Sequence, residues 1–290
     1  MDHPLDGCDL RLDRAYEHLS TLDDERSAFL DQEDRRVVGH FERDPSEYVF
    51  QFAGKLPDPE IGIVLSEFAH HLRAALDNLL WQLVLLRGGS PTRATQFPIY
   101  ESREGYERNA RRMLRGVSAD DRALIKIMQP YEATPDAPHL HALARIGWLN
   151  NTDKHRFLHV SCVAQQPSEV PLELVEGHTE AISRTGTLVL DDSEMDALSD
   201  FFAWWPIPVR DIGEVGGVRF GANSPSDDPT EFLRVSVVAT GANPEMKMKD
   251  DQSVDIALSD GETSITFDEL SILYRCVESV LDWFRPRFPL

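Results

Sequence analysis

The strongest constraint on the fold is the apolar pattern of residues 64–87. Its large apolar residues recur at steps of three and four: Phe68, Leu72, Leu76, Leu79, Leu83 and Leu86. That period is typical of one face of an α-helix. Gly88 and Gly89 then favour the end of the helix. Its second half also carries Leu80, Trp81, Val84 and Leu85, so it is apolar nearly all round. We therefore expect this helix to lie at the centre of a helical core.

Further helices are predicted before residue 160. The expected ranges are 9–36 with a break near Asp23–Asp24, 102–115, 118–128, and His139–Leu149 extending towards His159. Ser118 is expected to cap the third of these, and Asp136 the fourth, because both types accept hydrogen bonds from first-turn amides. A short alternating strand is expected at 47–53.

The pattern changes near residue 160 to short runs of strand type. The predicted strands are Arg156–Ala164, Leu172–Val175, Thr187–Leu190, Val218–Phe220, Phe232–Ala239, Val254–Leu258 and Ser264–Phe267. A short helix is expected at Ser193–Trp205, and an amphipathic closing helix at Asp268–Phe284. We therefore predict an α+β fold. It has two domains: a helical bundle at 1–158, and at 159–290 an antiparallel β layer with the closing helix.

Composition excludes several classes of protein. The formal net charge of -21 disfavours non-specific binding to duplex nucleic acid, although a local basic groove remains compatible with it. The first residues lack the basic and apolar regions of a signal peptide. The apolar stretch Leu79–Leu86 is too short to span a membrane. We expect a cytoplasmic protein with no membrane contact.

A polar cluster stands out against this apolar background. Its first half is Arg73 and Asp77, four residues apart on the central helix, and its second half is Asn151–His159. Histidine exchanges protons near neutral pH, and arginine binds phosphate through two parallel hydrogen bonds. The predicted catalytic residues are His155, Arg156, His159 and Asp153, with Arg73, Asp77 and Asn151 in binding roles. The alternative is structural: Asp77 pairs with Arg156, Asn151 or Thr152 caps a turn, and the cluster joins the bundle to the sheet.

A basic run supplies the remaining binding candidates. Arg108, Arg111, Arg112 and Arg115 share one helical face, with no acidic residue between them. They could guide RNA phosphates towards the polar cluster. Alternatively, they pair with acidic residues of neighbouring elements or of a second subunit.

No metal or cofactor is expected. His139 and His141 point to different sides of a helix, and neither this pair nor His70–His71 has a Glu or Cys at zinc spacing. Cys8, Cys162 and Cys276 are isolated, which argues against a disulfide framework. No nucleotide-binding or hydrolase motif is present.

Four sequence blocks resemble a family of uncharacterised bacterial proteins, many of them actinobacterial. The blocks are LRAALDNLLWQL (72–83), FPIY (97–100), MQPY (128–131) and LNNTDKHRFLH (149–159). Asn78 stands where the family often has His, so the resemblance implies no acid or base there. The resemblance implies no activity.

A more distant resemblance is to HEPN domains, which are helical, often dimeric and often RNases with an Arg-x(4–6)-His motif. Here Arg156 and His159 are separated by only two residues.

These observations leave several functions open. One is a metal-independent RNA-cleaving or RNA-binding HEPN-like protein in a toxin or phage-defence role. The alternative is a non-catalytic binding or scaffold protein, expected as a homodimer, whose polar cluster is structural. A third is a small-molecule binder with the β layer as a lid.

Overall fold

The computed structural model describes residues 3–33, 36–43, 46–152, 159–164, 188–190, 231–239, 254–259 and 263–288. These residues form two compact units, each assembled from separate stretches of chain. The helical unit comprises Met1–Asp24, Glu60–Leu158 and Ile265–Leu290. The strand unit comprises Glu25–Pro59 and His159–Ser264. The predicted domains had a single boundary after residue 158, whereas these units are divided differently. The closing helix belongs with the early helices, and a hairpin before residue 60 belongs with the late strands.

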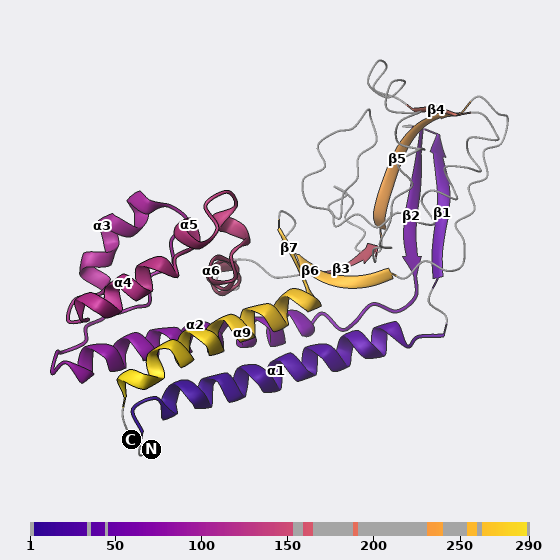
Figure 1. Ribbon diagram of the computed structural model, residues 1–290. Coiled ribbons are helices and arrows are strands. Elements are labelled where there is room, and N and C mark those ends of the chain that lie inside the picture. The colour runs from indigo at the N-terminus through magenta and orange to yellow at the C-terminus, as the bar shows by residue number, and fades with distance from the viewer. Residues whose placement is uncertain are drawn as a thin grey trace. The chain divides into compact units, whose positions relative to one another are not determined.

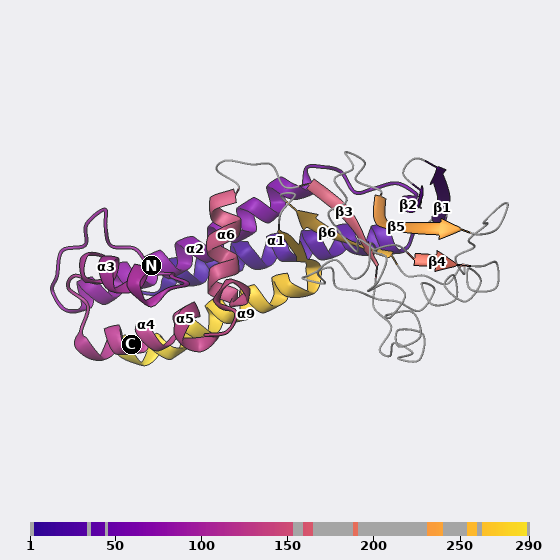
Figure 2. The same cartoon turned by 90° about the horizontal axis from the view of Figure 1, so that it is seen from above.

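The helical unit contains the last long helix and the first one as far as Asp24. Figure 1 shows α1, α2 and α9 running lengthwise beside one another, with α3 to α6 on one side of them. Figure 2 shows α6 crossing α2 and α9, and α6 contacts both. The bounds are α1 Asp6–Leu30, α2 Ile61–Leu86, α3 Arg103–Met113, α4 Ala119–Ile127, α5 Pro130–Ala133, the 3-10 turn η1 Pro138–Leu140, α6 Ala142–Thr152, α9 Phe267–Phe284 and the 3-10 turn η2 Arg285–Arg287.

The central helix predicted at 64–87 is α2. Its leucine face is fully buried, with Leu72, Leu76 and Leu79 each at 0% exposure. Its end is also as expected: Gly88 has a φ of 69°, and the amides of Gly88 and Gly89 donate to the carbonyls of Leu85 and Val84. This is the paired hydrogen bonding of a Schellman C-cap.

The second half of α2, although apolar nearly all round, is buried on one side only. Trp81, Leu85 and Leu86 are 43%, 46% and 41% exposed. An apolar residue is covered only where another element packs against it, and these three side chains lie off the buried face of α2.

Two other helix predictions need correction. α1 runs unbroken over Asp6–Leu30, and strand β1 begins at Arg36, so the helix neither breaks at Asp23–Asp24 nor reaches residue 36. The helix expected at His139–Leu149 begins later, at Ala142, after the turn η1. Asp136 is not its cap; the Nδ1 of His141 accepts a hydrogen bond of 3.2 Å from the amide of Leu143. The Ser118 cap is confirmed, because its side chain accepts from the amide of Asp121.

The strand unit contains a mixed sheet with the order β1-β2-β5-β4 and strands of a second sheet with the order β3-β6-β7. The bounds are β1 Arg36–Arg43, β2 Ser46–Ala53, β3 His159–Ala164, β4 Leu188–Leu190, β5 Glu231–Ala239, β6 Val254–Ser259 and β7 Ser264–Thr266. The β1–β2 hairpin pairs Arg36 with Ala53, and β2 pairs antiparallel with β5. β3 and β6 are antiparallel, with His159 opposite Ser259.

The β layer is not wholly antiparallel, because β4 and β5 run parallel, with Leu188 opposite Val237. The strands expected at 172–175 and 218–220 and the helix expected at 193–205 lie outside the described residues. With helices and sheets in separate parts of the fold, the chain is α+β, as predicted. Among the described helices, none has both the length and the apolar character that crossing a membrane requires.

The His141 cap predicts a pH dependence of stability. Burial lowers the pKa of His141, so between the folded and unfolded pKa values the unfolded chain binds more protons than the folded one. The contribution of His141 to the free energy of unfolding is complete above its pKa in the unfolded chain, about 6.5. This contribution is lost as the pH falls through the pKa of His141 in the folded protein. We expect the wild-type melting temperature, measured by circular dichroism, to fall as the pH drops below about 6.5.

His141→Asn should reduce this acid-induced fall, because asparagine accepts the same N-cap hydrogen bond without titrating. His139→Asn is the matched control, since His139 is exposed and should leave the profile unchanged. A profile for His141→Asn that overlays the wild type would contradict the role of the cap.

Candidate functional site

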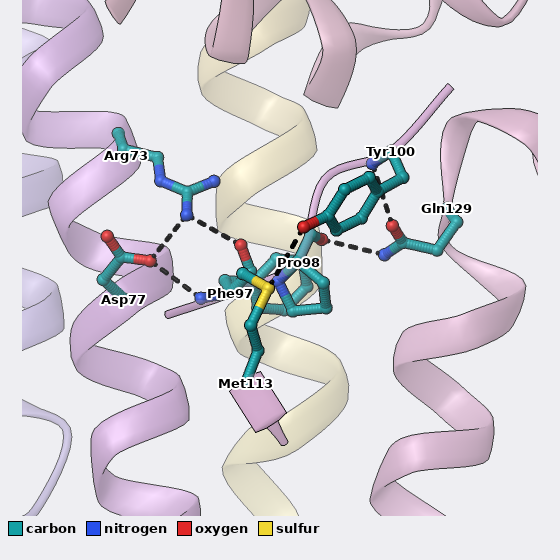
Figure 3. Close-up of polar contacts among 7 residues, drawn as sticks. All are labelled: Arg73, Asp77, Phe97, Pro98, Tyr100, Met113 and Gln129. Atoms are coloured by element: carbon teal, nitrogen blue, oxygen red, sulfur yellow. Dashed lines mark hydrogen bonds and ion pairs between the residues drawn. The ribbon is translucent and has the colours of Figure 1, made fainter. Parts of the chain in front are cut away.

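The first half of the predicted polar cluster holds the backbone of Phe97 (Figure 3). Arg73 Nη2 donates to Asp77 Oδ1 at 3.0 Å and to the carbonyl oxygen of Phe97 at 2.7 Å. The amide of Phe97 donates to the same Asp77 oxygen at 2.8 Å. The two α2 side chains therefore bind both backbone polar groups of Phe97, as a neighbouring strand would.

Gln129 holds the same segment from the other side. Its side chain is fully buried, and its Nε2 donates to the carbonyl oxygens of Pro98 at 2.9 Å and Ile125 at 3.1 Å. Its Oε1 accepts from the amide of Tyr100 at 3.2 Å. We call Arg73, Asp77, Phe97–Tyr100 and Gln129 the Phe97 cluster (Figure 3).

The Phe97 cluster gives a physical reason for three of the four sequence blocks. Phe97 and Pro98 are buried, and a buried backbone group without a partner costs about 1–3 kcal/mol. The α2 block supplies Arg73 and Asp77, the FPIY block supplies the extended backbone, and the MQPY block supplies Gln129. The cluster therefore fixes the backbone of residues 97–100. Arg73 donates its hydrogen bonds to Asp77 and to the carbonyl oxygen of Phe97.

Tyrosines gather beside the Phe97 cluster. The ring centroids of Tyr106 and Tyr131 are 5.8 Å apart, and those of Tyr100 and Tyr106 are 6.3 Å apart. Burial raises the pKa of Tyr106 to about 12 and also raises the pKa of Tyr131. These phenols stay protonated at neutral pH and are therefore unsuited to act as general bases.

The second half of the predicted cluster is described only in part. Asn151 is exposed in the last turn of α6, and its neighbour Thr152 is buried. Asp153, His155 and Arg156 lie outside the described residues. His159 opens β3, and only its backbone is among the described parts of the chain. The expected contact between Asp77 and Arg156 therefore stays a prediction.

The basic run lies on the outward face of α3. Arg108, Arg111 and Arg112 are exposed, and Arg115 is exposed in the turn after the helix, which ends at Met113 and not at residue 115. The opposite face of α3 is buried through Tyr106, Ala110 and Met113. Glu104 and Glu107 precede Arg108 and Arg111 by four residues, a spacing that allows ion pairs. In the described part of the chain, no close ion pair involves these four arginines, which we call the α3 arginine face.

Sequence reasoning missed a buried cation, Arg145. It is 4% exposed, its guanidinium carbon lies 4.7 Å from the ring centroid of Trp148, and its Nη2 lies 3.7 Å from Glu269 Oε2. Glu269 also accepts from the amide of Thr266 at 2.8 Å, forming the capping box of α9. The sequence signals for this contact are an arginine inside an apolar helix and the Thr-x-x-Glu pattern before α9.

Residues after α9 make a second missed set of contacts. Arg285 forms two hydrogen bonds to the carboxylate of Asp9 on α1, at 3.2 and 2.6 Å. Arg287 Nε bonds to Asp121 Oδ1 at 3.0 Å, and Asp121 is 1% exposed. These two ion pairs join the C-terminal turn to α1 and α4.

Histidines of α1 and α2 also meet. The rings of His18 and His71 are stacked, with centroids 5.5 Å apart and planes at 16°. Burial lowers the pKa of His71, and the charges of His18, Arg11 and His70 lower it further. Among the described residues, no group of three or more His, Cys, Asp or Glu is arranged to hold a metal ion.

Comparisons with known proteins identify no relative. No protein-family model, no curated protein and no solved structure matches this chain. The resemblance of the four sequence blocks to a bacterial family, and the more distant one to HEPN domains, therefore remain predictions.

The Phe97 cluster predicts a large effect of Asp77→Ala on stability. The change leaves the amide of Phe97 without its acceptor and Arg73 without its counter-ion. We expect the free energy of unfolding, measured by urea denaturation, to fall by about 2–3 kcal/mol. Asp24→Ala, an exposed aspartate of α1, should change it by less than about 0.5 kcal/mol.

A double-mutant cycle tests whether the two sides act on one segment. Asp77→Ala and Gln129→Met each release neighbouring backbone groups of 97–100, so their combined cost should be less than the sum of the two. Strict additivity, or an Asp77→Ala protein as stable as the control, would count against the cluster.

Proposed function

We propose that this protein binds RNA through the α3 arginine face. The supporting observation is that four exposed guanidinium groups lie together without an ion pair in the described part of a chain whose net charge is -21. Residues 103–115 carry five arginines and two glutamates, a local formal charge of +3. A local excess of positive charge in an acidic protein favours a polyanionic ligand at that place.

The chemistry of the face suits phosphate groups. Arginine offers a planar set of donors that binds phosphate oxygens through two hydrogen bonds. From Arg108 to Arg115 the chain advances roughly 10 Å along the helix direction, enough for a few nucleotides. Contacts of this kind fix the backbone of a nucleic acid without reading its bases, so we expect little sequence preference.

Binding should weaken when arginines of the face are neutralised. We expect Arg111→Gln with Arg112→Gln to reduce the affinity for a fluorescent single-stranded RNA, measured by anisotropy. The slope of log affinity against log salt should also become shallower, by about 0.7 for each phosphate that the variant no longer neutralises.

Arg14→Gln with Arg87→Gln is the matched control. Both arginines are exposed and lie on α1 and at the end of α2, so the net charge change is the same. Equal reductions in affinity in the two double variants would indicate a general charge effect and reject the α3 arginine face as the site. Failure of the wild type to bind would reject RNA as the ligand.

A more specific proposal is that the protein also cleaves the RNA that it binds. We propose His155 and His159 as acid and base, with Arg156 binding the phosphate and Asp153 orienting a histidine. The motivation is the residue types in 153–159. We expect the protein to degrade single-stranded RNA in the presence of EDTA, and His155→Ala to lose that activity while keeping RNA binding. If RNA survives equally with the wild type and with His155→Ala, the cleavage proposal is rejected and the binding proposal stands.

A non-catalytic scaffold is the second candidate. The observation that favours it is the Phe97 cluster, in which Arg73 and Asp77 of the polar cluster bind backbone. In this case His155→Ala should lower the melting temperature without changing any RNA-degrading activity. A His155→Ala protein that melts like the wild type and loses a cellular phenotype would argue against it.

A further inference from the structure

Helix α9 has apolar residues on a face that the helical unit does not cover. Leu270, Leu273, Val277, Leu281 and Phe284 are buried, whereas Ile272 and Trp283 are 59% and 64% exposed. Cys276 is half-buried, and Ser279 is exposed. Ile272, Cys276, Ser279 and Trp283 follow one another at steps of four, three and four residues, so they share one face of the helix. We call these four residues the α9 stripe.

The stripe is more than a chance exposure of single side chains. Isolated apolar residues are common on protein surfaces, but here an aliphatic and an indole side chain lie about three turns apart on one helix. Steps of three and four are the pattern of a helix that packs against another helix. Tryptophan is also among the residues that contribute most when buried at protein interfaces.

We propose that the α9 stripe is the contact between two copies of this chain, packed antiparallel about a twofold axis. The stripe is complementary to itself in this arrangement. Its midpoint lies between Val277 and Glu278, so Ile272 of one copy faces Trp283 of the other, twice. Cys276 faces Ser279 of the second copy at the centre, where small side chains let two helices approach closely. A twofold contact requires such self-complementarity.

The charges beside the stripe favour the same arrangement. Arg275 is exposed and lies seven residues after Asp268 and seven before Asp282, so the three follow one edge of the stripe. Antiparallel packing brings Arg275 of each copy near Asp282 of the other. Asp282 Oδ1 accepts from Arg285 at 2.8 Å, and a carboxylate has acceptor sites for a second arginine. Parallel packing would put the Arg275 edges of the two copies on opposite sides of the contact, so that neither arginine meets Asp282 of the other copy.

Sedimentation velocity over a concentration series tests the contact. We expect the wild-type protein to form a dimer that dissociates on dilution, and Trp283→Ser to raise the dissociation constant roughly 30-fold. Ile127→Ser is the matched control, because Ile127 is 62% exposed on α4 and lies outside the stripe. Circular dichroism should be unchanged in both variants, since both side chains are mostly exposed. A monomeric wild type, or a dimer that Trp283→Ser leaves intact, would overturn the proposal.

Cysteine cross-linking tests the orientation. In Ser279→Cys the new thiol lies opposite the native Cys276 of the second copy, so oxidation with copper–phenanthroline should give a covalent dimer. Peptide mapping should then find a disulfide between positions 276 and 279. Ser271→Cys, on another side of α9, should not cross-link through its new thiol. In Ser279→Cys, a covalent dimer with one disulfide joining the two positions 276 and another joining the two positions 279, but none between positions 276 and 279, would mean parallel helices and reject the antiparallel contact. These outcomes do not depend on RNA binding.

Discussion

The helical unit depends on satisfying the backbone of one buried, extended segment. Residues 97–100 have no neighbouring strand in the described part of the fold, and a buried amide or carbonyl without a partner is costly. Asp77 and Arg73 bind the amide and carbonyl of Phe97, and Gln129 binds Pro98 and Tyr100. The positions of α2 and of the α4–α5 junction are therefore linked through hydrogen bonds to this segment as well as through apolar packing.

Ion pairs extend the same principle to the end of the chain. The Arg145–Glu269 ion pair joins α6 to the start of α9. The ion pairs of Arg285 and Arg287 join the final turn to α1 and α4. Arg145 and Asp121 are the buried members of these pairs, so removing Glu269 or Arg287 would leave a charge in an apolar setting. The first and last helices thus form one unit although most of the sequence separates them.

The arginines of the described helical unit fall into two groups, those that contact other groups of the protein and those that point outward. Arg73, Arg145, Arg285 and Arg287 contact acidic or backbone groups of the protein, whereas the α3 arginine face points away from the core. The α9 stripe likewise points away from the core that α9 covers with its other face. The outward features are those that the packing of the helical unit does not explain, and they are the basis of the two binding proposals.

Several elements could be predicted from the sequence because their causes are local. The leucine period and the Gly88 stop define α2, the Ser118 cap defines the start of α4, and alternating residues define β2; each depends on neighbours a few positions away. The start of α6 was missed because a histidine cap has a weak sequence signal, and β1 was missed because its partner strand decides it. The polar cluster was recognised as unusual, but its residue types were equally compatible with chemistry and with structure.

The sequence by itself determined the α+β class, the central helix and the amphipathic closing helix, since periodicity and turn residues act over short distances. Only the tertiary structure decided that Arg73, Asp77 and Gln129 share the backbone of residues 97–100, and that α9 joins helices from the start of the chain. Such pairings bring together residues far apart in the sequence. Their partners are selected by burial and by the need to satisfy polar groups, which no local pattern encodes.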